Sequence, residues 1–190
     1  MSIHTETMPS AAQPKYTIIR DTREKPRTAW VFSDAVDMID KKLDTGDYSI
    51  IGLTNEIALE RKAPDDFLGS ITQGRKRFFR EIERLSVIPY SCIVVEESWE
   101  YYAERRYTQR VSVNAIRGTL ERIVKQYGVP VYFLPSRQDA ICFAERWLID
   151  KVTCISALPH FLPLPRFAGG TAARQIASDC SFTYRRTYPS

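Results

Sequence analysis

The sequence has few of the residues that build several common kinds of site. It contains two histidines, His4 and His160, and four cysteines, and no two of these lie at CxxC-like spacing. Zinc sites and disulfide frameworks usually show such spacings, so neither is indicated. We interpret the cysteines as buried, reduced thiols because their neighbours are apolar. They are Cys92, Cys142, Cys154 and Cys180.

Long apolar runs and a strong charge excess are also missing. No run approaches the roughly 20 apolar residues of a membrane-spanning helix, and residues 1–14 lack the apolar centre of a signal peptide. We therefore expect an intracellular protein without a membrane association. The net charge of +4 is compatible with a polyanionic partner but is too small to identify one. With 44% hydrophobic and 12% aromatic residues, wholesale disorder is excluded.

The segment 46–66 holds two runs that alternate in polarity, separated by the turn-like residues GLTN. A hairpin that reverses between Leu53 and Thr54 places Tyr48 opposite Leu59 and Asp47 opposite Glu60. Side chains alternate across a strand, so this register separates apolar from charged residues. The apolar face would consist of Tyr48, Ile50, Ile57 and Leu59, and the other of Asp47, Ser49, Ala58, Glu60 and Lys62.

The second face brings two carboxylates and an ammonium together. Directly opposed residues have Cβ atoms about 4.5–5.5 Å apart, and like charges at that distance are unfavourable. Asp47 and Glu60 are better explained as ligands of a hard divalent cation, with Lys62 beside the reacting group. The alternative is a solvated face whose carboxylates point apart, which is the more common origin of an isolated D…ExK pattern.

Several short motifs, in order and spacing, resemble those of the XPF/Mus81 (ERCC4-type) structure-selective endonucleases. The resemblance covers about residues 16–152, the extent of the nuclease domain in that family. The matching residues are Gly46-Asp47, Glu60-Arg61-Lys62 with Asp66, Asp21-Thr22-Arg23-Glu24 for the DxRE element, Gly74-Arg75 for the GR element, and the strand Cys92 to Glu96.

The resemblance implies a restriction-endonuclease-like core and metal-dependent hydrolysis of DNA phosphodiester bonds. Asp21, Asp47 and Glu60 would hold Mg²⁺ or Mn²⁺, and Lys62 would orient the attacking water or neutralise charge on phosphorus. Supporting roles fall to Arg23, Glu24, Arg61 and Asp66, and DNA contacts to Arg75, Lys76 and Arg80. A charged turn at Asp21 to Glu24, and a solvated helix face around Arg75, are the structural alternatives.

The implied function is a DNA endonuclease that acts on branched DNA (flaps, forks or junctions) in repair or recombination. Two alternatives stay open: a nuclease for duplex or foreign DNA without branch selectivity, and a catalytically silent DNA-binding or dimerisation scaffold. The family commonly forms dimers, so a homodimer or a dimer with a DNA-binding partner is expected. The sequence has no room for the helix-hairpin-helix domain of larger family members.

The remaining pattern predicts an α/β fold with a central mixed sheet flanked by helices. We expect strands at 16–20, 91–95 and 129–134, and helices at 64–86, with a break near Gly74, at 112–126 and at 136–152. The hairpin would form an antiparallel edge of the sheet. The state of 34–44 is left open, and 99–110 is a loop or short helix. Glu96 is expected to be a capping or exposed carboxylate.

Three segments follow from this organisation. Residues 1–14 are predicted to be a flexible leader, 15–153 the nuclease domain, and 154–190 a basic extension that contains Pro and Gly.

Overall fold

A computed structural model describes residues 16–25 and 27–157 of the chain. The predicted leader and almost all of the predicted extension, with His4, His160 and Cys180, lie outside these residues. The strands are β1 (Tyr16–Arg20), β2 (Val36–Asp40), β3 (Tyr48–Ile50), β4 (Ile57–Lys62), β5 (Tyr90–Val95) and β6 (Val131–Phe133). The helices are α1 (Pro64–Ile71), α2 (Arg75–Leu85), α3 (Trp99–Ala103), α4 (Val113–Arg122), the π-helical turn η1 (Ile123–Tyr127) and α5 (Arg137–Ala157).

The six strands form one mixed sheet in the order β2-β1-β3-β4-β5-β6. β4, β5 and β6 are parallel, as are β1 and β2, and β3 is antiparallel to both of its neighbours. The α/β class and the mixed sheet were predicted correctly. The predicted edge position of the hairpin was wrong, because β1 pairs with β3 and places the hairpin in the middle of the sheet.

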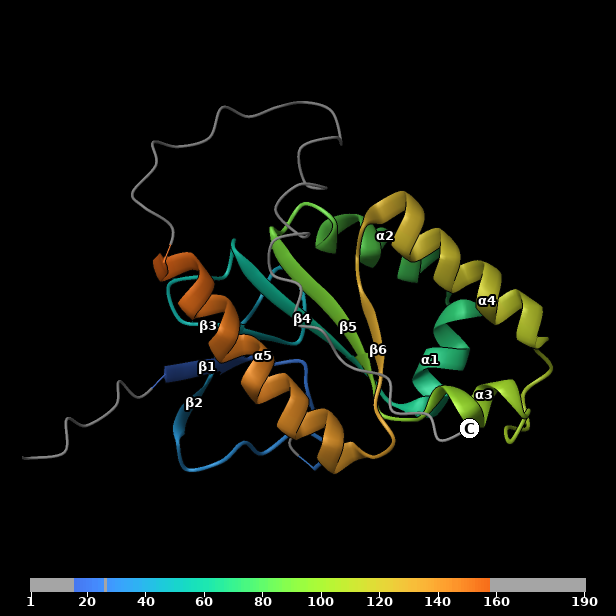
Figure 1. Cartoon of the computed structure of the whole chain (residues 1–190), viewed down its shortest axis with the longest axis horizontal. Coiled ribbons are helices and arrows are strands. Elements are labelled where there is room, and N and C mark those ends of the chain that lie inside the picture. Colours follow the sequence, from blue (N-terminus) through green and yellow to red (C-terminus); the bar gives the residue numbers. More distant parts are fainter. Residues whose placement is uncertain (1–15, 26, 158–190) are drawn as a thin grey trace, which may run out of the picture.

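Helices cover both sides of the sheet (Figure 1). α5 packs on one side, in a core that includes Tyr48, Leu59 and Trp147. α1, α2 and α4 pack on the other, in a second core that includes Ala58, Phe67 and Phe78. The strands between them are therefore buried on both sides, which explains the continuous apolar run of β5. Within the described residues, no helix is long and apolar enough to cross a membrane.

The hairpin register agrees with the polarity pattern. Tyr48 pairs with Leu59, and the four apolar residues of the predicted face all lie in the α5-side core. The opposite face is not solvated as the alternative supposed, since α1 and α2 cover it. Ser49, Glu60 and Lys62 are only 1%, 3% and 8% exposed. Polar side chains in such surroundings need specific partners, because burial without hydrogen bonds is costly.

Local signals explain where the helices begin and end. Pro64 lies in the first turn of α1, where its missing N–H removes no hydrogen bond. The predicted break near Gly74 is present, since α1 ends at Ile71 and α2 begins at Arg75. Gly128 has a positive φ of 69° and terminates η1.

The segment 34–44, whose state was left open, contains the edge strand β2, and 99–110 begins with the short helix α3, one of its two expected states. Two other expectations need correction. α5 continues to Ala157, past the predicted helix and domain ends. Cys92 is buried as expected, but Cys142 is exposed because it lies on the outer side of α5.

Candidate active site

A pocket of about 500 Å³ opens where residues 44–47, just before β3, and the end of β4 meet α1 and α2. Its walls are rich in charge of both signs. Its acidic residues are Glu24, Asp44, Asp47, Glu60, Asp65, Asp66 and Glu81, and its basic residues are Arg23, Arg61, Lys62, Arg77 and Arg84. The sequence-predicted residues Asp47, Glu60 and Lys62 therefore share one pocket.

Lys62 and Glu60 form an ion pair at the wall of this pocket. Both point to the same side of β4 because they are two residues apart, and Nζ of Lys62 lies 2.6 Å from Oε1 of Glu60. The same Nζ lies 3.2 Å from Oε2 of Glu81, which reaches in from α2. The ammonium is thus held between a strand carboxylate and a helix carboxylate, both facing the pocket.

The two acids influence each other's protonation. Burial raises the pKa of Asp47 to about 7, with a further contribution from the negative charge of Glu24. Burial also raises the pKa of Glu60 well above its usual value, and the charge of Asp47 adds to the effect. Burial disfavours the Lys62 ammonium, but Glu60 and Glu81 outweigh it and raise the lysine pKa. The pocket therefore concentrates negative charge that its one buried lysine does not fully neutralise.

Arg61 connects the pocket to a buried ion network on the opposite side of the sheet. Its backbone N–H donates a 2.8 Å hydrogen bond to Oδ2 of Asp47. Its guanidinium donates to Glu24 at 2.8 Å and to both oxygens of Glu96 at 2.7 and 3.2 Å. The predicted supporting role of Arg61 remains a prediction, and the contacts show what it holds in place.

Glu96 is the centre of that network and not the expected capping or exposed carboxylate. It is 8% exposed and also accepts hydrogen bonds from Nε1 of Trp30 and Nη1 of Arg137. Burial opposes its ionisation, but the donors of Arg61 and Trp30 lower its pKa. Arg137 further donates to the backbone oxygens of Thr28 and Ala29, so α5 is tied to the chain after β1.

Asp21 is buried, but its carboxylate does not line the pocket. One oxygen accepts from the backbone N–H of Arg23 at 2.8 Å and from its Nε at 2.6 Å. The other accepts from the N–H of Leu43 at 2.6 Å. These donors outweigh burial and lower the pKa of Asp21. Among residues 16–25 and 27–157, no three acidic, His or Cys side chains form a metal cluster, so the predicted Asp21–Asp47–Glu60 set is not assembled.

The other predicted residues divide between two locations. Glu24 and the exposed Asp66 line the pocket, but no hydrogen bond or ion pair joins Asp66 to Arg61 or Arg23 within the described part of the chain. The predicted DNA contacts lie around a separate hollow beside α2; they are Arg75, Lys76 and Arg80.

Sequence reasoning missed three residues that line the pocket from α2: Arg77, Glu81 and Arg84. They recur at spacings of four and three residues and so share one side of the helix. That spacing was available in the sequence. The sequence does not show which strand this side of α2 packs against, because Glu81 and Lys62 are brought into contact only by the tertiary fold.

A profile of the ERCC4 domain matches residues 20–145. Among curated proteins, "Putative ATP-dependent RNA helicase MJ1505" of Methanocaldococcus jannaschii is 29% identical over 122 residues, which is 64% of this chain. The match spans only 14% of that relative's length.

Two solved structures share the fold. "XPF from Aeropyrum pernix" superposes with a TM-score of 0.60 at 23% identity, covering 81% of this chain and 70% of that one. The same protein in complex with DNA gives a TM-score of 0.56 at 22% identity, with 76% and 68% coverage. The architecture is therefore that of the XPF nuclease domain, a restriction-endonuclease-like fold, as expected from the sequence.

Proposed function

The chain belongs to the ERCC4 domain family of DNA nucleases, and from this premise we propose that it is a divalent-cation-dependent endonuclease for branched DNA. The observation that carries the proposal is the pocket shared by Asp47, Glu60 and Lys62. A solved structure of similar fold is a complex with DNA, which supports nucleic acid as the substrate.

The chemistry of the pocket fits a hard cation. Mg²⁺ is commonly held by one or two carboxylates together with waters and substrate phosphates, so Asp47 and Glu60 are a sufficient protein donor set. Burial and nearby negative charge disfavour the ionised form of both carboxylates unless a positive partner is bound. Bound there, Mg²⁺ or Mn²⁺ would polarise a phosphate oxygen and lower the pKa of a bound water.

The protein residues would then orient the reacting groups. Lys62, fixed by Glu60 and Glu81, presents an ammonium for the charge that develops on phosphorus. Arg61 holds the Asp47 carboxylate through its backbone N–H. Asp21 acts through Arg23, which it fixes at the rim, where Arg23 can bind a neighbouring phosphate. In this assignment Asp21 is a positioning residue, whereas the sequence alone suggested a direct ligand.

Cleavage of labelled flap, fork, Holliday-junction and plain duplex DNA, each with Mg²⁺ or with EDTA, tests the proposal. We expect Mg²⁺-dependent cleavage that is faster on a branched substrate than on duplex. Glu60→Gln should reduce the rate by about 100-fold or more, since it removes a buried charge at the reacting phosphate. Glu56→Gln, an exposed carboxylate that immediately precedes β4, is the matched control and should cleave normally.

The outcomes separate the alternatives. Equal rates on duplex and branched DNA would indicate a nuclease without branch selectivity. DNA binding without cleavage in Mg²⁺ or Mn²⁺ would indicate a silent scaffold and overturn the enzymatic proposal. Light scattering of the same preparation would establish whether the expected homodimer forms or a DNA-binding partner is needed.

A further inference from the structure

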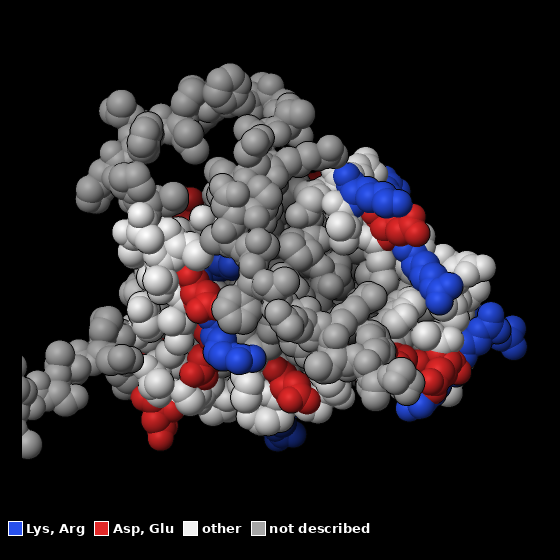
Figure 2. Space-filling model, viewed as in Figure 1, with Lys and Arg blue, Asp and Glu red and all other residues white. Residues whose placement is uncertain are grey.

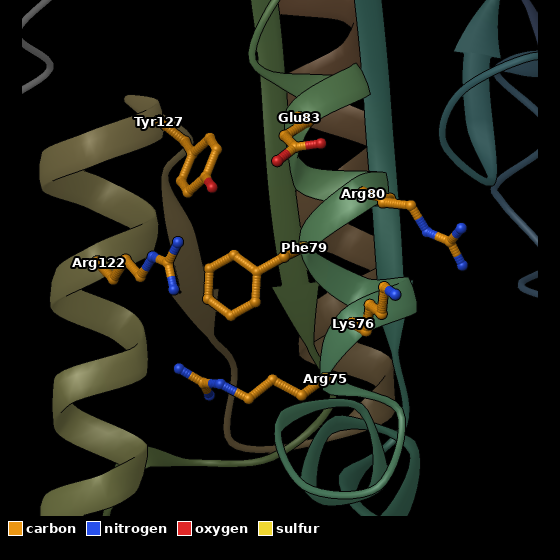
Figure 3. A pocket seen from close by; sticks show the side chains of 7 residues that line it. All are labelled: Arg75, Lys76, Phe79, Arg80, Glu83, Arg122 and Tyr127. Carbon is orange, nitrogen blue, oxygen red and sulfur yellow. The ribbon is translucent and has the colours of Figure 1, made fainter.

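A second hollow of about 500 Å³ lies between α2 and the segment formed by α4 and η1. Four cationic side chains and one carboxylate line it, with Phe79 and Tyr127. In Figure 3, Arg75 and Arg122 reach into the space between the helices from opposite sides, and Phe79 lies between them. Lys76 and Arg80 extend over the outer surface of α2 (Figure 3). We refer to this hollow as the α2–α4 groove.

The groove is built around stacked guanidinium groups. The guanidinium carbons of Arg75 and Arg122 lie 4.8 and 4.4 Å from the centre of the Phe79 ring. The ring of Tyr127 is 5.8 Å from the same ring, and it reaches this position from the π-helical turn η1. Single π-turns of this kind often occur at functional sites.

These guanidinium groups retain free donors. Arg75 uses Nη1, which donates to Oγ1 of Thr119 at 2.8 Å and to the oxygen of Ile71 at 3.4 Å. Arg122 uses Nε, which donates to Oε1 of Gln126 at 2.9 Å. Each guanidinium has five N–H donors in a planar fork, so several on each are available for an acceptor at the groove.

The remaining cations of α2 connect this groove to the catalytic pocket. Successive residues of an α-helix are turned by about 100°, which places Arg84 and Arg77 on the pocket side, Arg80 and Lys76 next around the surface, and Arg75 at the groove. None of these five side chains forms an ion pair with another residue of the described ranges 16–25 and 27–157. A band of five cations therefore runs across α2 from one hollow to the other, interrupted by the carboxylate of Glu83 at the groove.

On the part of the surface that Figure 2 shows in colour, basic and acidic side chains lie interspersed. α2 carries five cations against two carboxylates, Glu81 and Glu83, so positive charge is concentrated on this helix in a chain whose net charge is only +4. Such a band attracts a polyanion without reading its sequence.

We propose that the α2–α4 groove binds a DNA phosphate that flanks the one cleaved, with the strand crossing α2 along the cationic band. This rests on the proposed function, because it takes the catalytic pocket as the place of cleavage. A helix with its side chains is about 10–12 Å across, and the phosphates of one strand of a duplex advance by about 3.4 Å each along the duplex axis. The groove therefore meets a phosphate roughly three nucleotides from the scissile one.

The groove is suited to bind the phosphate backbone of DNA and not a base. Phe79 is 8% exposed, and two guanidinium groups already lie near its ring, so this ring is not open for a base to stack on. Guanidinium forks oriented by a ring offer in-plane donors that match phosphate oxygens. The site adds affinity for any sequence and fixes the direction of the strand over the catalytic pocket.

The test is the salt dependence of DNA binding, measured by fluorescence anisotropy on the full chain with EDTA present to prevent cleavage. Arg122→Gln should weaken binding on the order of fivefold at low salt and reduce the slope of log K against log[salt] by about 1. Lys76→Gln with Arg80→Gln is a second pair of exposed cations, and its loss should act in the same direction. Arg146→Gln removes an exposed charge from α5, on the other side of the sheet, and should change neither quantity.

Position is tested with single methylphosphonate linkages, which remove one phosphate charge at a time. A neutral linkage about three nucleotides from the cleaved bond should weaken binding to the wild-type protein but not weaken it further in Arg122→Gln. Equal losses at every linkage in both proteins, or an Arg122→Gln variant that binds like Arg146→Gln, would overturn the proposal. Absence of cleavage by the wild-type protein would instead refute the proposed function, so the two failures are distinguishable.

Discussion

The backbone N–H of Arg61 donates a 2.8 Å hydrogen bond to Oδ2 of Asp47, while the side chain of Arg61 binds Glu96 on the opposite side of the sheet. One residue thus joins the buried ion network to a candidate catalytic carboxylate. Strand alternation makes this possible, because the side chain of Arg61 points away from the side occupied by Glu60 and Lys62. The network is therefore part of what orients Asp47.

Asp47→Asn is expected to stabilise the metal-free protein at neutral and alkaline pH. Burial raises the pKa of Asp47 to about 7 from a usual value near 3.8. Between these values the folded protein binds more protons than the unfolded chain, so stability decreases as the pH rises from about 4 to 7. At pH 8 in EDTA, urea unfolding should show a gain of about 2 kcal/mol for Asp47→Asn.

That gain should disappear below about pH 4, where the carboxyl is protonated in both folded and unfolded chains. Glu56→Gln serves as the control because its carboxylate is exposed, and its effect should be small at every pH. A variant of Asp47 that is less stable than wild type at pH 8 would show that the carboxylate is compensated in the folded protein.

Divalent cations should stabilise the wild-type protein and not the variants that lack the pocket acids. A cation that binds only the folded state adds RT ln(1 + [L]/Kd), or about 2.7 kcal/mol at a concentration 100 times Kd. Mn²⁺ should therefore raise the Tm of the wild type, with a much smaller rise for Asp47→Asn and Glu60→Gln. If Mn²⁺ also fails to raise the Tm of Asp21→Asn, Asp21 takes part in metal binding despite its hydrogen bonds to Arg23.

The hairpin could be predicted from sequence because its register has a physical signature within the segment itself. A slip of one residue would move Tyr48 and Leu59 to the charged side, so the polarity pattern admits one solution. The neighbours of the hairpin have no such signature. Whether β3 lies at an edge depends on β1, which is distant in sequence, and the edge strand β2 is mostly exposed and so lacks a regular apolar alternation.

The motifs likewise named segments that meet at the pocket, without giving the geometry of their side chains. Asp21 and Glu24 belong to one short element, yet only Glu24 lines the pocket, because the donors of Arg23 and Leu43 hold the Asp21 carboxylate elsewhere. Such choices depend on rotamers and on neighbours brought in by folding. Glu81 was overlooked for the same reason.

Glu96→Ala should be strongly destabilising. Its carboxylate is 8% exposed and accepts from Arg61, Arg137 and Trp30, so removing it leaves the largely buried guanidinium of Arg61 without its main partner. Breaking a buried pair in this way costs about 3–5 kcal/mol. Asp40→Ala breaks the pair with Arg20, in which the Asp40 side chain is 55% exposed, and should destabilise the protein far less because solvent screens that pair. Urea unfolding of both variants measures the contrast, and similar values would show that the network contributes little.

Gly46→Ala should impair catalysis as well as folding, and Gly52→Ala provides its control. Both glycines have positive φ values, 78° and 79°, so alanine costs about 1–2 kcal/mol of backbone strain at either position. They differ in surroundings. A Cβ at Gly46 would lie 3.1 Å from the oxygen of Leu59 and 3.3 Å from Cβ of Ala58, whereas a Cβ at Gly52 would meet nothing within 4 Å.

The crowded site lies beside Asp47, whose N–H donates to that same Leu59 oxygen at 2.8 Å. Relief of the contact must therefore shift the backbone that carries the carboxylate, and displacements of about 1 Å near a reacting centre can reduce rates about 100-fold. We expect Gly46→Ala to lower Mg²⁺-dependent cleavage at least about tenfold and Gly52→Ala to remain within about twofold of wild type. Equal activity of the two variants, measured on folded protein below their Tm, would mean that the position of Asp47 does not control the reaction.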